Sequence, residues 1–187
     1  MNASGKLLII STGVIALTAY LTGSSAEARR VFARGPNGAL GGYANQGTWG
    51  RNAGGAIVGP NAGAGLRGGQ YTGANGGTFN TGGGFAYKRG VGAGRSSGWN
   101  GTAPNGSSGS GYSNMRYNAQ TGQGTRNSSE QVKNAAGQTA GYNGNTTFTK
   151  GQGGDTQIDT DHKGDYNVDW AKGQKPTVSE TPAPASN

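Results

Sequence analysis

Two short strings resemble catalytic or cofactor-binding motifs. Residues 63–68 match the GxGxxG pattern of dinucleotide-binding loops, in which glycines let the backbone approach a pyrophosphate at the start of a helix. The residues that follow favour turns over a helix. Residues 94–98 match the GxSxG pattern of a hydrolase nucleophile, but the chain has one His and no strand-then-helix pattern here. We therefore predict that neither string is functional and that the protein is not an enzyme.

A group of carboxylates near the C-terminus is the other candidate for site chemistry. Residues 159–164 imitate the start of an EF-hand loop, but Lys163 replaces an oxygen ligand and Trp170 stands at the twelfth position, which needs Glu. His162 is expected in a solvated turn, and without Cys or a second His no zinc site can be built. We predict no metal and no cofactor. The carboxylates are expected on a solvent-facing strand surface, at Asp155, Asp159, Asp161, Asp165 and Asp169.

The clearest chemical feature is a run of positive charge. Residues 29–129 contain ten Lys or Arg and no Asp or Glu. Such a segment attracts anionic polysaccharide, lipopolysaccharide or membrane surfaces in a salt-dependent way. The alternative is that the charge only keeps the chain soluble. No specific nucleic acid partner is predicted, since the single Arg-Gly-Gly triplet at 67–69 is not an array. The candidate anion contacts are Arg34, Arg51, Arg67, Lys88, Arg89, Arg95, Arg116 and Arg126.

The composition argues against a conventional globular core. The chain has 187 residues with 40 Gly, no Cys and a net charge of +8. Beyond the N-terminal segment 1–28, Leu, Ile, Val and Phe together make up about 9% of the chain, whereas packed cores need roughly 20%. Disulfides, the usual remedy in small exported domains, are excluded by the absence of Cys. Order must therefore come from backbone hydrogen bonds and aromatic side chains.

The N-terminal segment 1–28 has the pattern of a secretory signal peptide. Lys6 precedes an apolar run at 7–21, and positions 26–28 form a small-x-small cleavage site. The apolar run is shorter than the roughly 20 residues of a membrane-spanning helix. We therefore expect export to the periplasm, the cell surface or the extracellular space.

Residues 29–111 form a basic, glycine-rich, low-complexity region. Pro-Asn turns recur at 35–38, 59–62 and 103–106, at unequal intervals that define no fixed repeat. Isolated aromatic residues lie between the turns. Two interpretations stay open: a marginal β-ribbon with one aromatic on each short strand, or a disordered chain of aromatic stickers and glycine spacers.

Residues 112–172 are expected to form a small antiparallel β-meander. Strands are predicted at 145–150, 155–161 and 165–170, joined by hairpin turns, and a weaker hairpin is centred on 134–137. In the last strand Tyr166, Val168 and Trp170 share one face by the period of two. Residues 173–187 are expected to be a disordered, proline-containing tail. The predicted fold class is thus mainly β and irregular.

The Gly-Pro-Asn-Gly turn at 35–38, its later versions and the string at 117–124 resemble exported glycine- and asparagine-rich proteins of Gram-negative bacteria. That resemblance implies a location at the periplasm or cell surface and implies no activity or site residue. Our first hypothesis is a noncatalytic structural or surface protein of the cell envelope or extracellular matrix, capable of self-association. The alternative is a basic binder of anionic envelope polymers, including extracellular DNA. In size, basicity and glycine content this alternative resembles the antibacterial attacins of insects.

Overall fold

The structure is a computed structural model that describes residues 28–181. Almost all of the predicted signal peptide lies outside the described residues. The described chain consists of strands and turns, with no helix. The strands are β1 (Ala28–Gly35), β2 (Gly38–Gly47), β3 (Gly50–Val58), β4 (Ala62–Thr72), β5 (Thr78–Lys88), β6 (Gly92–Thr102), β7 (Ser108–Asn118), β8 (Gln123–Lys133), β9 (Thr139–Thr149), β10 (Gly153–Thr160), β11 (Asp165–Ala171) and β12 (Thr177–Thr181).

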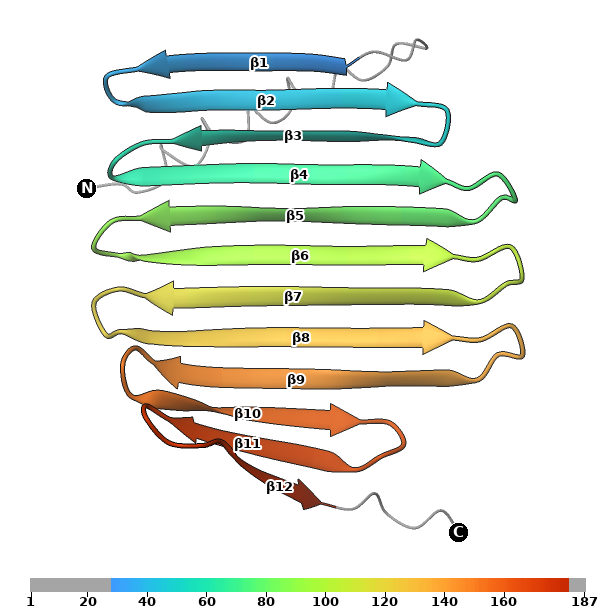
Figure 1. Cartoon of the computed structure of the whole chain (residues 1–187), viewed down its shortest axis with the longest axis vertical. Helices are drawn as coiled ribbons and strands as arrows, with labels where there is room; N and C mark the ends of the chain where they lie inside the picture. The colour runs from blue at the N-terminus through green and yellow to red at the C-terminus, as the bar shows by residue number, and fades with distance from the viewer. Residues whose placement is uncertain (1–27, 182–187) are drawn as a thin grey trace, which may run out of the picture.

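All twelve strands belong to one open antiparallel sheet in chain order, a meander (Figure 1). The predicted β class is confirmed, and so are the three C-terminal strands and the hairpin at 134–137. Of the two interpretations of the glycine-rich region, the ribbon is the one found, because β1 to β6 occupy residues 28–102. The expected boundary at residue 112 falls inside β7, and the ladder continues across it without a break.

A hairpin repeat underlies the central strands. Strands β4, β6, β8 and β10 begin at Ala62, Gly92, Gln123 and Gly153, so successive hairpins start at nearly equal intervals along the chain. We call one such interval the hairpin unit. The expectation of no fixed repeat is therefore wrong for residues 62–153. It failed because the Pro-Asn turns occupy loops of different kinds, between β1 and β2, β3 and β4, and β6 and β7.

The loops at one end of these hairpins have one geometry. The three loops are 73–77, 103–107 and 134–138, and in each the first N–H donates to the carbonyl of the last residue, at 2.7, 2.7 and 2.9 Å. The fourth residue adopts φ of 85°, 83° and 87° at Gly76, Gly106 and Gly137. Side chains rarely tolerate this conformation, so glycine is needed there. Each of these loops thus has a glycine at its fourth position, and this glycine marks the repeat in the sequence.

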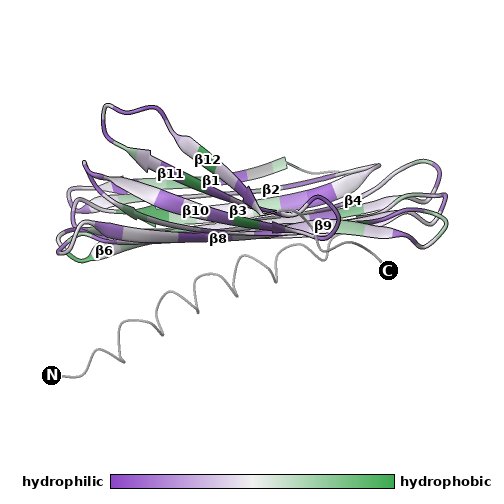
Figure 2. Ribbon diagram, turned by 90° about the horizontal axis from the view of Figure 1, so that it is seen from below, coloured by the Kyte–Doolittle hydropathy of each residue, from purple (hydrophilic) through white to green (hydrophobic). Residues whose placement is uncertain are grey.

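The sheet is one layer thick (Figure 2). No large hydrophobic side chain of residues 28–181 is buried. The only buried residues in this part of the chain are four glycines: Gly54, Gly65, Gly124 and Gly164. The absence of a conventional core is therefore confirmed for the described residues. The backbone ladder is the main source of order, since strands β4 to β9 have equal lengths and pair along nearly their full extent.

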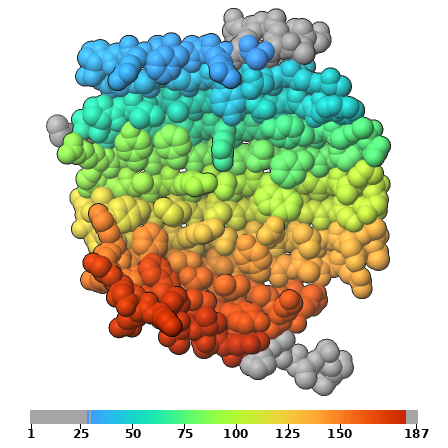
Figure 3. Space-filling model, viewed as in Figure 1, coloured from blue at the N-terminus to red at the C-terminus, as the bar shows by residue number. Residues whose placement is uncertain are grey.

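The C-terminal strands differ from the rest. Strand β12 lies inside the segment expected to be an unstructured tail and pairs with β11 along its whole length. Pro176 precedes this strand and Pro182 follows it, and proline cannot donate a hydrogen bond to the ladder, which limits its length. Strands β11 and β12 tilt out of the plane of the other strands (Figure 2). The space-filling view shows the strands side by side in chain order, from β1 at one edge of the sheet to β12 at the other (Figure 3).

Candidate functional site

The cross-strand register divides the side chains of the strands between two contrasting faces. Directly paired residues share a face, and alternate residues of a strand lie on opposite faces. All but one of the aromatic residues in the described strands fall on one side, which we call the aromatic face. They are Phe32, Tyr43, Tyr71, Phe79, Phe85, Tyr87, Trp99, Tyr117, Tyr142, Phe148, Tyr166 and Trp170. The exception, Tyr112, lies on the other side.

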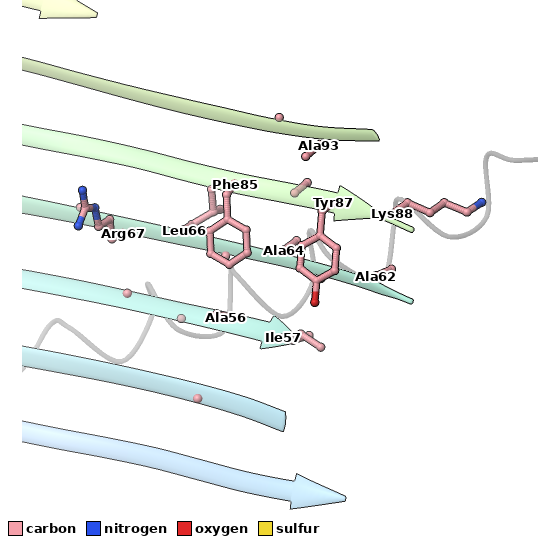
Figure 4. Close-up of a pocket in the computed structure, with 18 of the residues that line it drawn as sticks. Ala56, Ile57, Ala62, Ala64, Leu66, Arg67, Phe85, Tyr87, Lys88 and Ala93 are labelled. Carbon is pink, nitrogen blue, oxygen red and sulfur yellow. The ribbon is translucent and has the colours of Figure 1, made fainter. Parts of the chain in front are cut away.

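Rings on the aromatic face lie over glycines of the neighbouring strand. A Cβ placed on Gly63 or Gly65 of β4 would collide with the ring of Tyr87 or Phe85 of β5. Figure 4 shows these two rings side by side on the same face of the sheet. A Cβ on Gly124 would likewise collide with the ring of Phe148. The aromatics thus cover exposed backbone at glycine positions, which replaces a packed core by ring-on-backbone contacts.

The rings also contact one another. Tyr117 of β7 and Phe148 of β9 stack across Gly124 of β8, with ring centroids 6.4 Å apart and planes 4° from parallel. Phe79 stacks with Trp99 at 6.0 Å. Phe85 and Tyr87 stack along β5 at 6.5 Å. These separations are typical of favourable aromatic pairs. The result is a broad, solvent-facing aromatic surface across the sheet.

The opposite side, which we call the amide face, carries rows of amide and hydroxyl side chains. One row of successive cross-strand partners, from β6 to β12, is Ser96, Asn114, Asn127, Asn145, Gln157, Asn167 and Ser179. Asn145 Nδ2 donates to Asn127 Oδ1 at 2.7 Å, and Asn80 Nδ2 donates to Asn100 Oδ1 at 2.9 Å in a second row. Over β1 to β4 this face carries the apolar side chains Val31, Leu40, Ile57 and Leu66 in addition to a polar row of Gln46, Arg51 and Gln70.

The eight candidate anion contacts are dispersed. Arg34, Arg67, Arg95 and Arg126 lie on the aromatic face, whereas Arg51, Lys88 and Arg116 lie on the amide face and Arg89 is in a turn. Of these eight, only Arg95 and Arg126 share a cross-strand row, on either side of Met115. Arg51 donates to Gln70 Oε1 at 2.9 Å through a terminal guanidinium nitrogen, and Arg126 Nε donates to Ser113 Oγ at 3.2 Å.

The C-terminal carboxylates lie mainly on the amide face. Asp155 and Asp169 are direct cross-strand partners, and Asp159 and Asp165 occupy the same face further along these strands. Within residues 28–181 no three His, Cys, Asp or Glu side chains are arranged to hold a metal ion. His162 lies in the predicted turn, with Nε2 2.9 Å from the carbonyl oxygen of Thr139. The string 63–68 lies within β4 and the string 94–98 within β6.

Tyr166, near the β12 edge of the sheet, has a raised pKa. Tyr166 Oη donates to Glu180 Oε1 at 3.2 Å and so links β11 to β12. Desolvation, the negative charge of Glu180 and this hydrogen bond together raise the pKa of Tyr166. The neutral phenol is therefore the form that the folded edge favours.

A hollow on the described surface has a volume of about 2020 Å³ and extends over β1 to β8. Glycine and alanine make up about half of its lining, which also includes Ile57, Leu66, Phe85 and Tyr87, several of them drawn in Figure 4. Four of the candidate anion contacts line it too: Arg51, Arg67, Lys88 and Arg116. Asp, Glu, His and Cys are absent from this lining. Because the sheet has a single layer, the hollow is an open surface and excludes no water.

Comparison with protein-family models, with curated proteins and with solved structures finds no match to this chain. In residues 28–181 no helix is long and apolar enough to cross a membrane.

Sequence reasoning missed the pairing of rings with glycines and the separation of the two faces. A signal was present: Tyr87, Tyr117 and Phe148 recur with the spacing of the hairpin unit, in step with the loop glycines 76, 106 and 137. Alignment on these residues, instead of on the Pro-Asn turns, would have revealed the unit.

Proposed function

We propose that the protein is a noncatalytic, exported structural protein of the cell envelope or extracellular matrix, which acts by self-association of its sheet. The observation that carries this proposal is the single-layer sheet whose aromatic face is covered by no other part of residues 28–181. Exposed side chains on this face include Phe79 at 43% and Phe85 at 41% exposure. Large aromatic side chains that stay exposed on a protein surface in this way mark a contact surface.

The energetics also favour association. A sheet exposed on both faces has no core and is stabilised by its backbone ladder, its ring-on-glycine contacts and its amide rows, while its many glycines raise the entropy cost of folding. Contact with the sheet of another molecule would bury apolar area, and each Å² of apolar area removed from water contributes about 25 cal/mol of stabilising free energy. Assembly is therefore expected to increase the stability of the folded sheet.

The test is sedimentation velocity on the full chain, expressed with its own leader and recovered after export, over a hundredfold range of concentration. We expect concentration-dependent association that persists between about 50 and 200 mM salt, the range over which purely electrostatic binding is lost, with a β-sheet infrared signature in the assembled fraction. A chain that stays monomeric throughout this range would contradict the proposal.

A second function, binding of anionic envelope polymers, is favoured by one specific arrangement. Arg95 and Arg126 flank Met115 in one row, and Phe85 is the next partner of Arg95 in that row. Strands are about 4.8 Å apart, so the two cations lie about 10 Å apart beside a ring. A polysaccharide that crosses the strands would meet a stacking surface and two cations.

Salt separates the two functions. Binding of a sulfated or uronic-acid polysaccharide should weaken steeply between about 50 and 200 mM salt, and Arg95→Gln/Arg126→Gln should reduce the salt slope by about two counterions. Arg89→Gln/Arg116→Gln is the matched control, since those residues lie outside the row. If both double variants lose the same affinity for the polysaccharide, binding depends on the total charge of the protein and not on this row.

A further inference from the structure

The two edges of the sheet present the most exposed apolar side chains of the described chain. Phe32 of β1 is 73% exposed and Val178 of β12 is 62% exposed, more than any other large hydrophobic side chain in residues 28–181. Both lie on the aromatic face. An edge strand also presents backbone N–H and C=O groups without a partner, which is a template for pairing with another chain.

We propose that β12 of one molecule pairs with β1 of a second copy, so that the sheet continues from molecule to molecule as a filament. The inference rests on the proposed structural function and names the contact by which that function is carried out. It commits to a second copy of this chain as the partner because the two edges are complementary in direction, in face and in charge.

Strand direction favours this pairing. The meander alternates strictly and has an even number of strands, so β1 and β12 run in opposite directions. A second copy in the same orientation therefore presents its β1 antiparallel to β12 of the first. The addition continues the antiparallel alternation already present between all neighbouring strands. It is also heterologous, joining two different surfaces, and such contacts extend without closing unless a rotation brings the ends together.

Residue chemistry selects one register. If Val178 lies opposite Phe32 of the second copy, antiparallel pairing places Glu180 opposite its Arg30 on the same face. This register therefore forms an apolar cross-strand pair and an opposite-charge pair together. A shift of two positions in one direction places Glu180 opposite Phe32 and Val178 opposite Arg34, and in the other it places Val178 opposite Arg30. Both shifts lose the two favourable pairs.

Charge on a larger scale points the same way. Strand β1 contains three arginines and no acid, whereas residues 165–181 contain three acids, Asp165, Asp169 and Glu180, against two lysines in the turn between β11 and β12. Pairing of β1 with β1 would bring these arginines together across a two-fold axis, which like-charge repulsion disfavours. The basic edge and the acidic edge thus favour head-to-tail contact over either symmetric contact.

The pairing also keeps both faces continuous. In the selected register Phe32 extends the aromatic face of the first molecule, while Ser179 meets Val31 on the amide face. Since β12 is a short strand between two prolines, each junction has a shorter ladder and is weaker than the ladders between the central strands. Assembly should therefore be reversible and dependent on concentration.

Disulfide trapping tests this geometry directly, because the chain contains no native Cys. Directly opposed residues of an antiparallel pair have Cα atoms about 4.5–5.5 Å apart, within the range that a disulfide spans. We would express the full chain as Phe32→Cys/Val178→Cys and oxidise it mildly. The expected result is a ladder of dimers, trimers and longer species on a non-reducing gel, collapsed by reductant. Both positions are highly exposed, so the substitutions remove little packing within the molecule.

The matched control is Phe32→Cys/Ser179→Cys, in which the second thiol is at the next position and on the amide face. It should give less than about one tenth of the cross-linked product, because its Cβ vectors point apart. Mixing the single variants Phe32→Cys and Val178→Cys should give mainly the mixed dimer. Cross-linking of Phe32→Cys with itself at the same rate would overturn the head-to-tail arrangement in favour of a symmetric one.

A charge exchange gives a second measurement that needs no thiol. Arg30→Glu and Glu180→Arg should each weaken association by up to about fivefold, and an equimolar mixture of the two variants should associate better than either alone. If the wild type associates but the double-cysteine chain is not cross-linked and the charge variants are unaffected, the edge pairing is wrong while the structural function stands. If the wild type does not associate at any concentration, both fail.

Discussion

The aromatic face and the amide face are built on the same backbone, yet they stabilise it in different ways. On the aromatic face, rings from one strand cover glycines of the next, as Phe148 covers Gly124. On the amide face, amide and hydroxyl side chains follow each other across the strands and hydrogen-bond to their neighbours, as Asn145 donates to Asn127. The first mechanism depends on shape, because a ring fits only where no Cβ intervenes. The second depends on polarity and tolerates substitution.

The comparison explains why glycine content is high without causing disorder. A glycine beneath a ring is a residue whose missing side chain makes room for a neighbour. Three of the four buried glycines in the described chain, Gly54, Gly65 and Gly124, lie against a ring in this way. Entropy lost at glycine is thereby offset by apolar burial supplied from the next strand.

The largest effect is expected from a side chain introduced at one of these glycines. Gly124→Val should displace the Phe148 ring and its stacking with Tyr117, and should lower the free energy of unfolding by about 1–3 kcal/mol, the usual cost of overpacking. Urea denaturation followed by fluorescence measures the loss. Gly68→Val is the control, because a Cβ there meets nothing nearer than 3.6 Å. Equal losses in the two variants would mean that the rings do not depend on glycine.

The stacking of one ring pair should contribute a smaller amount. Phe148→Ala loses the stacked pair with Tyr117 and uncovers Gly124, and the lost stacking should make it about 0.5–1.5 kcal/mol more destabilising than removal of an unstacked ring. Tyr112→Ala is matched to it, since Tyr112 is the aromatic residue of the amide face and is 56% exposed. Unfolding curves for the two variants should separate clearly. Coincident curves would remove the distinction between the faces.

On the amide face, a double-mutant cycle measures how much one side-chain hydrogen bond contributes to stability. Asn127→Ala, Asn145→Ala and the double variant should give a coupling of about 0.5–1 kcal/mol, the net worth of one hydrogen bond at a solvent-exposed position. The single substitutions should leave the aromatic pair distances unchanged, which ring-current shifts in the proton NMR spectrum can report. A coupling near zero would show that the amide rows add polarity but no stability.

The smallest expected effect concerns pH at the β12 edge. The folded-state pKa of Tyr166 is raised, so its contribution is fully present below the ordinary tyrosine pKa near 10 and is lost as pH rises above it. Between about pH 9 and 11 the wild type should lose more stability than Tyr166→Phe, which keeps the ring and cannot ionise. Trp170 fluorescence in urea at each pH is a suitable measure. Parallel pH profiles would exclude a role for the Tyr166–Glu180 hydrogen bond at this edge.

Much of the fold could be predicted from composition and local pattern. The β class, the lack of a core and the C-terminal hairpins follow from few aliphatic residues, alternation in segments such as 165–170, and turn chemistry. The repeat could not be found from the Pro-Asn turns because proline marks only some of the loops. Strand β12 was missed because Pro176 and Pro182 suggest a tail, and tertiary pairing with β11 overrides that local signal.

The candidate site was harder to predict for a physical reason. A face is created by register, and register follows from loop lengths that bring Tyr87, Tyr117 and Phe148 to one side. The cations carry no such periodicity, so their sequence run gave no indication of which ones lie together. Arg95 and Arg126 occupy one row because β6 and β8 are separated by a single strand in space, although a whole hairpin unit separates the two residues in the chain.

The hairpin unit also makes the width of the protein adjustable. Duplication of one unit would add two strands, widening the sheet by about 10 Å, and would turn neither face over, because equivalent residues of successive units lie on the same side. The number of strands would stay even, so both edges would keep their directions. Unequal recombination between such units could therefore change the span of the molecule in fixed steps while leaving both of its ends as they are.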